Sequence, residues 1–284
     1  MFGVDTILSR ITRAGISLDL FPTNCEKSLQ DVMVRRDFMV QTFGGNGRMT
    51  FPSISSSRVE GHGLNDFMYI CPQWQPIAPE VPGAPGLWLT IDEYNRHGQT
   101  KRLFTRISRC PALWQYQGQY ELRSAQKLTK EEWRKQPEIL RNTWATEMCH
   151  QNWGIFMRTR IYGRKYWGRT PTKEECNDIA FQKLYEHIQK EDVALALTRG
   201  EETLAVYTMK CVGYDIRFQR EVAERYARWE PEQEKEGLKR DQKRKNKADQ
   251  ATLTPPTKRQ RLPPSYYGGE YDDLGDLSDL TDIE

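Results

Sequence analysis

The stretch from Arg102 to Arg123 reads as two neighbouring β-strands and constrains the fold more than any other part of the chain. A period of two residues is typical of a strand with one buried and one solvated face. The run over residues 103–108 is strand-like, and in the second half apolar residues alternate with glutamines and charged residues. The stretch therefore predicts an antiparallel pair of strands inside a folded domain. The apolar positions of the second strand are Trp114, Tyr116, Tyr120 and Leu122.

Gly118 interrupts this apolar face. A glycine inside a strand accompanies a bulge, a close approach of another backbone or a ligand, or a plain twist of the sheet. We expect the plain twist and keep the other two as alternatives.

Aromatic and apolar residues divide the chain into a folded part and a tail. All eight tryptophans of the 284 residues lie at or before Trp229, and a charged run begins after Pro231. Segments with many charges and few apolar residues bury too little surface to fold. The sequence therefore predicts a weakly structured segment over residues 1–30, a folded domain over 31–229, and a disordered tail over 230–284 that is first basic and then acidic.

Helices are predicted from their start signals and their periodicity. Thr129 and Thr172 each open a capping box, because a glutamate follows three residues later. A further helix follows Pro137, and its apolar face consists of Ile139, Leu140, Trp144 and Met148. Helices are also expected over residues 31–42, 172–188, 194–198 and 215–229.

Strands are predicted over residues 87–90 and 204–212, while five prolines between residues 72 and 85 predict an extended segment without regular structure. Helices and strands follow one another without a repeating strand–helix–strand pattern. The expected fold is therefore α+β, with an antiparallel or mixed sheet packed with several helices.

The sequence signatures of common enzyme classes are missing. There is no nucleophile elbow, HExxH helix, paired CxxC or Walker sequence. A zinc site drawn from Cys149, His150, Cys176 and Cys211 has no support in the spacing of these residues. We expect no catalytic residues, no metal, no cofactor and no membrane span. An enzyme of unidentified class, with a pocket near Gly118, stays as an alternative.

The loop over residues 44–47 contains three glycines and an asparagine. Such loops end helices because both residue types tolerate positive φ, and glycine-rich loops can also hold phosphate. The lysine and hydroxyl residue that follow the glycines of a P-loop are missing here. We therefore expect a turn.

A basic and aromatic stretch over residues 155–169 contains no acidic residue. If residues 155–162 form a strand, Arg158, Arg160 and Tyr162 share its solvent face. Arginines beside aromatic rings suit phosphate contact and base stacking. The alternative is a solvated strand whose cations pair with acids elsewhere. The candidate nucleic-acid site consists of Arg158, Arg160, Tyr162, Arg164, Lys165, Tyr166, Trp167 and Arg169.

The tail contains two basic clusters, and proline pairs enclose the second. Prolines keep such a segment extended, so that its basic side chains are accessible to an acidic receptor groove. We predict a signal that a nuclear import receptor binds, and hence a nuclear protein; a solubilising charged tail is the alternative. The signal residues are Lys243, Arg244, Lys245, Lys258, Arg259 and Arg261.

The segment from Asp273 to Ile283 repeats an aspartate before a leucine or isoleucine. This alternation is typical of disordered segments that bind a protein groove. It predicts either recruitment of a partner protein or folding back onto the basic clusters, and the residues leave both open.

Four composite motifs together resemble one family. They are VRRDFMVQTFGGNGRMTFPSI, HGLNDFMYICPQWQPIAPEVPGAPGLWL, LFTRISRCPALWQYQGQYEL with the later KLTKEEW, and RGEETLAVYTMKCVGYD. Over roughly residues 32–225 the chain resembles an uncharacterised domain of unknown function that is expanded in mushroom-forming (basidiomycete) fungi. The resemblance implies a fungal, nuclear protein and no assigned activity.

These features favour a non-enzymatic nuclear protein. Its domain would contact DNA, RNA or chromatin, and its tail would supply import and recruitment. A protein-interaction module of a nuclear complex, without nucleic-acid contact, is the alternative.

Overall fold

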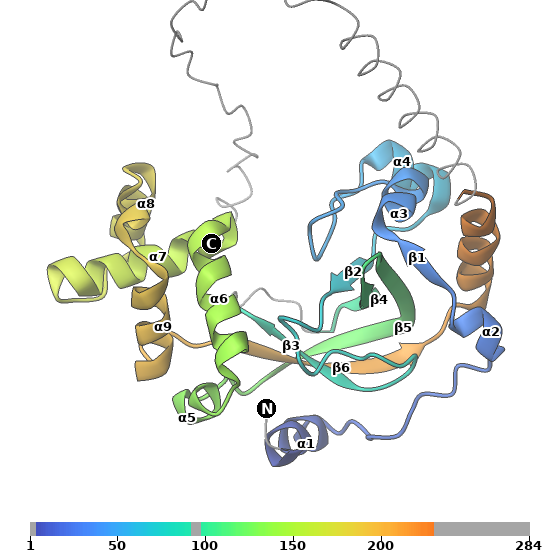
Figure 1. Ribbon diagram of the computed structural model, residues 1–284, viewed down its shortest axis with the longest axis horizontal. Helices are drawn as coiled ribbons and strands as arrows, with labels where there is room; N and C mark the ends of the chain where they lie inside the picture. Colours follow the sequence, from blue (N-terminus) through green and yellow to red (C-terminus); the bar gives the residue numbers. More distant parts are fainter. Residues whose placement is uncertain (1–3, 92–97, 230–284) are drawn as a thin grey trace, which may run out of the picture. The chain divides into compact units, whose positions relative to one another are not determined.

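The computed structural model describes residues 4–91 and 98–229 (Figure 1). They belong to one compact unit that extends from Met1 to Pro231. The unit combines helices with a curled mixed sheet, so the expected α+β fold is confirmed. The import signal and the acidic segment predicted in the tail lie outside the described residues.

Six strands form one sheet in the described part of the chain. Five of them follow the order β2-β4-β5-β6-β3, and β1 pairs with β5. Strand β2 is parallel to β4, and the other pairs are antiparallel. The strands predicted at the centre, over 87–90 and over 204–212 are confirmed as β4, β5, β3 and β6. The bounds are β1 Met33–Arg35, β2 Phe67–Ile70, β3 Gly86–Thr90, β4 Thr100–Arg109, β5 Ala112–Ala125 and β6 Ala205–Gly213.

Gly118 lies at a bulge in the long strand β5. The pairing of β4 with β5 shifts register next to Gly118, and the pairing of β5 with β6 shifts between Gln119 and Tyr120. The backbone of Gly118 has φ +127°, and a Cβ there would lie 2.8 Å from the carbonyl oxygen of Gly213. The plain twist that we expected is therefore wrong. The bulge and the close approach of another backbone are correct.

The bulge divides the apolar residues of β5 between the two faces of the sheet. Trp114 and Tyr116 pack with Phe104 of β4, whereas Tyr120 and Leu122 pack in another cluster with Leu103 of β4. Leu103 and Phe104 are consecutive strand residues and so point to opposite faces. One extra residue in a strand exchanges its two faces, because side chains alternate with a period of two. The apolar stripe thus stabilises two cores.

The face of β5 that we expected to be solvated is partly buried. Gln117 is completely buried, and Gln115 is nearly so. The Gln115 amide donates to the carbonyl oxygen of Gln30 at 2.9 Å, and the Gly83 N–H donates to the carbonyl oxygen of Gln117 at 2.9 Å. Two segments far away in the sequence therefore cover this face. The expectation of a wet face is wrong for these two glutamines.

Helices cover the sheet at two places. Leu87, Leu89 and Val206 of β3 and β6 share a core with α5, α6, α7 and α9. Phe104 and Tyr116 share a second core with α3 and a helix over residues 216–229. Figure 1 shows these two helical groups at different ends of the sheet. The helix bounds are α1 Val4–Arg13, α2 Lys27–Gln30, α3 Arg36–Phe43, α4 Ser56–His62, α5 Lys130–Arg134, α6 Glu138–His150, α7 Ile155–Tyr162, α8 Lys173–Phe181 and α9 Lys190–Arg199.

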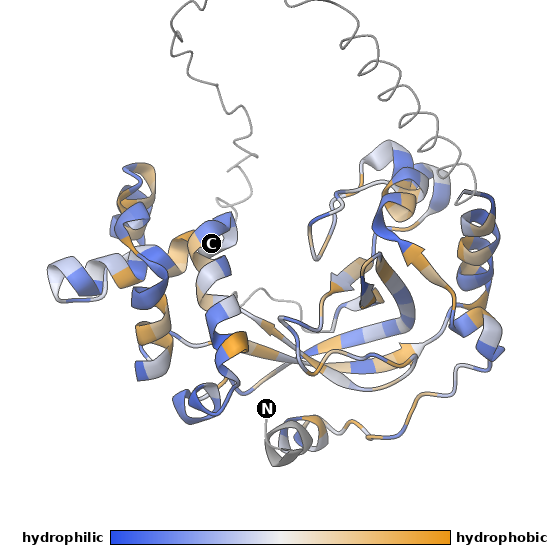
Figure 2. Ribbon diagram, viewed as in Figure 1, coloured by the Kyte–Doolittle hydropathy of each residue, from blue (hydrophilic) through white to orange (hydrophobic). Residues whose placement is uncertain are grey.

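Both predicted capping boxes are present. The Thr129 hydroxyl accepts from the Glu132 N–H, and the Glu132 carboxylate accepts from the Thr129 N–H at 2.8 Å. Thr172 and Glu175 repeat the arrangement at the start of α8. Figure 2 shows a mainly hydrophilic α5, which buries only Trp133.

Three expectations about helices are wrong. Residues 33–35 form β1, so the helix expected over 31–42 begins at Arg36. Helix α8 ends at Phe181, because Lys183 has φ +56° and residues 184–187 form the separate 3₁₀ helix η3 (Leu184–His187). Ile139 is 77% exposed and does not share the buried face of Leu140.

Candidate nucleic-acid interface

The stretch expected as a strand over residues 155–162 is helix α7, which continues as the π-helix η2 (Gly163–Trp167). Met157 and Ile161 are one turn apart and are both buried in the core of α5 to α9. The strand expected over these residues is therefore wrong. The reason is that apolar residues and cations alternating over only eight residues fit a helix as well as a strand. Arg158 and Arg160 consequently do not share a face.

Arg160 and Arg164 both bind Glu202, which lies before β6. The Arg160 Nη2 is 2.6 Å from Glu202 Oε2, and the Arg164 Nη2 is 2.5 Å from Oε1. The side chain of Glu202 is only 5% exposed. Residues four apart on a helix lie on the same side, which explains how the two arginines reach one carboxylate.

The two exposed cations of this stretch also have acidic partners. Lys165 Nζ lies 2.8 Å from Asp192 on α9, and this contact raises the pKa of Lys165. Arg169 contacts Glu175 at 2.5 Å and, through that hydrogen bond, lowers the pKa of the Glu175 carboxyl to about 2. The charges of the stretch are thus mostly cancelled by its own neighbours.

Arg158 is buried rather than exposed. Its guanidinium lies 4.6 Å from the centre of the Tyr185 ring and donates to the carbonyl oxygen of Gln151 at 3.2 Å. Burial lowers the pKa of Arg158. A phosphate that approached residues 155–169 would therefore find one buried arginine and four ion-paired cations. The nucleic-acid role of these residues stays a prediction, and the geometry agrees better with the alternative of internal pairing.

Three aromatic residues of the stretch come together at the end of α7, and we call them the aromatic patch: Tyr162, Tyr166 and Trp167. The ring centres of Tyr162 and Tyr166 are 4.6 Å apart. The rings of Tyr162 and Trp167 are 5.9 Å apart and nearly perpendicular, at 87°. Tyr166 is 53% exposed and Trp167 41% exposed. Tyr162 and Tyr166 are four residues apart and would be neighbours on any helix, whereas the π-helix η2 brings Trp167, five residues after Tyr162, to the same side.

A second basic region, which the sequence reasoning missed, surrounds Arg36 at the start of α3. Arg36 is only 8% exposed and has no carboxylate partner in the described part of the chain. Its guanidinium lies 3.0 Å from the centre of the Tyr69 ring and donates to the carbonyl oxygens of Asn46 and Met49. Burial lowers the pKa of Arg36. The fold thus keeps an uncompensated cation beneath the loop over residues 44–50.

Arg106 of β4 lies on the same side of the molecule. Burial raises the pKa of the neighbouring Cys71 thiol, and the charges of Arg106 and Arg36 both oppose that rise. Arg106 is half-buried and pairs in register with Trp114, whose ring also lies 5.8 Å from the Arg36 guanidinium. The charges of two arginines from separate elements therefore act on one thiol.

Two exposed arginines complete this region. Arg58 of α4 donates to the carbonyl oxygen of Gln41, and its Cγ would be 3.4 Å from a Cβ at Gly44. Arg48 belongs to the loop that Arg36 supports, and its N–H donates to the Asn46 side chain. The turn expected there is confirmed. We call the four residues the arginine face: Arg36, Arg48, Arg58 and Arg106.

No ion pair joins the arginine face to an acid within residues 4–91 and 98–229. The sequence gives a weak signal for this region, because its members are spread over about seventy residues and each stands in an unremarkable local context. Only the packing of α3, α4 and β4 brings them together. The cations that cluster along the sequence are instead those of residues 155–169, which acidic neighbours largely neutralise.

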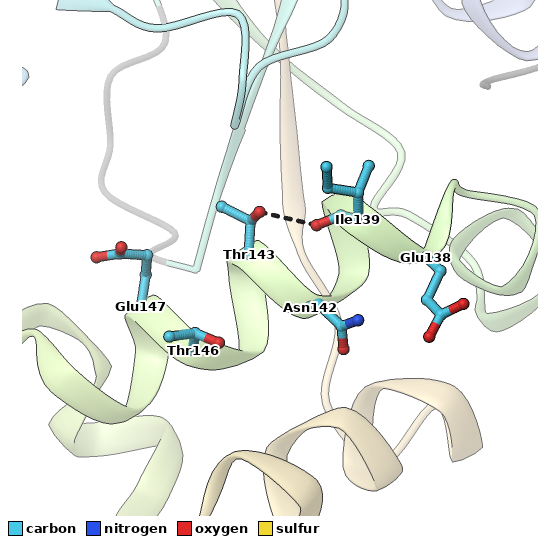
Figure 3. Close-up of a pocket in the computed structure, with 6 residues that line it drawn as sticks. All are labelled: Glu138, Ile139, Asn142, Thr143, Thr146 and Glu147. Atoms are coloured by element: carbon cyan, nitrogen blue, oxygen red, sulfur yellow. Dashed lines mark hydrogen bonds between the residues drawn. The ribbon is translucent and has the colours of Figure 1, made fainter.

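The cysteines, the surroundings of Gly118 and the surface of α6 are the other places where a site was expected or could lie. The six cysteines are all free, and no group of three or more His, Cys, Asp or Glu that could hold a metal occurs in the described residues. The space beside Gly118 is filled by Gly213 and by Cys211 Sγ. An open hollow of about 530 Å³ runs along the outer side of α6 (Figure 3). Its lining residues are Glu138, Ile139, Asn142, Thr143, Thr146 and Glu147.

A family model described as a domain of unknown function (DUF6697) matches residues 33–225. No curated protein and no solved structure matches the chain. In the described part, no helix has the length and apolar character to cross a membrane.

Proposed function

The chain belongs to the family of the domain of unknown function DUF6697, and we propose its function from the geometry of the domain. We propose a non-enzymatic nuclear protein that contacts the phosphates of nucleic acid through the arginine face. The observation that carries the proposal is that none of these four arginines has a carboxylate partner among residues 4–91 and 98–229. An unpaired guanidinium offers several N–H donors in a planar fork that fits phosphate oxygens. The ion-paired stretch over residues 155–169 offers far fewer free donors.

The proposed contact is with the backbone rather than with bases. Arg48 and Arg58 are exposed, and buried Arg36 adds positive potential beneath their loop. Phosphate contacts position a protein on nucleic acid but contain no sequence information. We therefore expect binding that depends weakly on sequence and strongly on salt.

A gel-shift titration tests the proposal, with a short DNA duplex and an RNA single strand of equal length. The full chain is compared with a variant in which Arg48, Arg58 and Arg106 are alanine, at about 50 and 200 mM salt. Each lost phosphate contact lowers the salt slope by about 0.7 to 0.9, so the triple variant should lose about two to three units of slope. The matched control is Lys165→Ala with Arg169→Ala, which removes two cations from the stretch over residues 155–169.

Two results would overturn the proposal. One is the lack of binding to either nucleic acid at low salt. The other is equal weakening by the triple variant and by the control, which would return the contact to residues 155–169.

The nuclear location and the fungal origin are also proposals, supported by the tail sequence and by the resemblance respectively. Alanine at Lys258, Arg259 and Arg261 should release a fluorescent fusion from the nucleus at least in part. The chain has a mass of 33.3 kDa, so a bulky fusion is needed to prevent passive entry. Unchanged nuclear accumulation would show that residues 239–247 suffice or that the signal is misread.

A further inference from the structure

We propose that Arg36 is a positioning residue for the arginine face: its buried guanidinium fixes the loop over residues 44–50, so that Arg48 meets a phosphate in an already ordered loop. The inference rests on the proposed contact with nucleic acid and adds to it. Arg36 is only 8% exposed and is itself too buried to bind a phosphate. It therefore acts through Arg48.

One nitrogen of Arg36 holds the loop on both sides of Arg48. Arg36 Nη2 donates to the carbonyl oxygen of Asn46 at 2.7 Å and to that of Met49 at 3.0 Å. These carbonyls lie two residues before and one residue after Arg48. The Arg48 N–H donates to the Asn46 side chain at 2.7 Å, which ties the same short segment a third time. The backbone around Arg48 is thus fixed while its side chain stays exposed.

Tyr69 of β2 joins this arrangement to the sheet. The Arg36 guanidinium lies 3.0 Å from the centre of the Tyr69 ring, and the Tyr69 N–H donates to the carbonyl oxygen of Thr50 at 2.8 Å. A cation over an aromatic ring is attracted to it, and the attraction is stronger away from water. The sheet therefore sets the position of Arg36, and Arg36 sets the position of the loop.

The glycines of the loop make such a tie valuable. Gly44 and Gly45 have φ +89° and +85°, and glycine loses more conformational freedom than any other residue when it is ordered. A loop that is ordered only on binding weakens the complex by the entropy lost, whereas a preorganised loop does not. Arg36 should therefore raise the affinity of the arginine face without adding a phosphate contact.

Stability alone does not explain an arginine at this position. Arg36 Nε and Nη1 are buried and have no hydrogen-bond partner in the part of the chain that the structure describes. A buried cation with unpaired N–H groups and no carboxylate destabilises a fold. Local features that oppose stability are typical of functional sites. This unfavourable burial supports a role of Arg36 in binding.

Two measurements on the full chain test the role with Arg36→Lys, because lysine lacks the planar fork of donors. The first is the gel-shift titration, in which we expect about tenfold weaker binding of the DNA duplex and an unchanged salt slope. Arg48→Ala should instead lower the slope by about 0.7 to 0.9. The second is hydrogen exchange of the amides in residues 45–50, which should be faster in Arg36→Lys with no nucleic acid present.

Arg158→Lys is the matched control. Arg158 is also buried, lies 4.6 Å from the centre of a tyrosine ring and donates to one backbone carbonyl, but it lies outside the arginine face. Its substitution should lower the Tm and leave nucleic-acid binding unchanged. Asn46→Ala is a second test, since it removes a tie of the loop without altering a buried charge, and it should also weaken binding.

Unchanged affinity in a folded Arg36→Lys variant and in Asn46→Ala would overturn this inference and leave the proposed function intact. A salt slope that falls as much in Arg36→Lys as in Arg48→Ala would also overturn it, since Arg36 would then contact phosphate itself. Lack of binding by the wild-type chain would overturn the proposed function and this role together. Faster loop exchange in Arg36→Lys would in that case show a structural tie only.

Discussion

Arg10 of α1 holds the carboxylate of Glu132 with two hydrogen bonds, at 2.7 and 2.6 Å, across 122 residues of sequence. The same guanidinium donates to the carbonyl oxygens of Gln126 and Lys127. Glu132 also caps the start of α5. One buried arginine therefore joins α1, which lies outside residues 33–225 of the family match, to the start of α5, which lies inside them.

Arg10→Ala should destabilise the domain by about 1.5–3 kcal/mol, because it removes charge-assisted hydrogen bonds and leaves Glu132 without its cation. Urea unfolding followed by circular dichroism measures this change. Arg13→Ala is the control, since Arg13 is exposed on the same helix and makes one long bond to Gln126. A similar loss for both variants would contradict the role assigned to Arg10.

The lowered pKa of the Glu132 carboxyl predicts that the domain loses stability in acid. Burial alone would raise the pKa of its carboxyl, but hydrogen bonds from Arg10 and Thr129 outweigh burial and lower the pKa. A carboxyl whose pKa is lower in the folded state than in the unfolded state, where it is near 4.5, stabilises the fold at pH values above 4.5. This contribution to the free energy of unfolding disappears as the pH falls through the folded-state pKa. Wild type and Glu132→Gln should therefore differ most in stability near neutral pH and converge as the pH falls through the lowered folded-state pKa. A constant difference across this range would contradict the assignment.

Much of the fold can be predicted from local signals. The capping boxes at Thr129 and Thr172 depend on residues three apart, and the structure contains both. The strands β4 and β5 follow from their alternation and from the short connection between them. Gly118 indicated a bulge or a close backbone approach as alternatives, but the sequence could not decide between them and a plain twist, because the outcome depends on the approach of Gly213 from a strand about 95 residues later.

Gly118→Ala should destabilise the domain by about 1–3 kcal/mol. The residue has φ +127°, which disfavours a side chain, and the new Cβ would meet Gly213 O at 2.8 Å and Cys211 Sγ at 3.0 Å. Thermal unfolding measures the change as a lower Tm. Gly61→Ala is the control, because Gly61 lies in α4 with open space around it and should be neutral or slightly stabilising. An unchanged Tm for Gly118→Ala would show that the bulge relaxes freely.

The candidate site was harder to predict than the fold. The cations of residues 155–169 form a clear pattern in the sequence, but their acidic partners lie between residues 175 and 202 and are invisible until α7 to α9 pack together. The arginine face has the opposite property, since its members look ordinary in sequence and meet only through α3, α4 and β4. Charge density along a chain therefore says little about free charge on the surface.

Glu202→Gln should loosen the end of α7 that presents the aromatic patch. Glu202 is buried and accepts from Arg160 and Arg164, so a neutral amide would place N–H donors against guanidinium donors. We expect a loss of about 1.5–3 kcal/mol in the free energy of unfolding, less than for a fully buried pair because both arginines are partly exposed.

The control for this substitution is Glu201→Gln. Glu201 is more exposed and lies 3.6 Å from Arg164 and 3.7 Å from Arg199, and surface pairs of this kind contribute about 0–1 kcal/mol. Hydrogen exchange of the amides in residues 155–167 should speed up in Glu202→Gln and not in Glu201→Gln. Equal exchange in the two variants would show that α7 and the aromatic patch are held by the apolar contacts of Met157 and Ile161 rather than by the buried carboxylate.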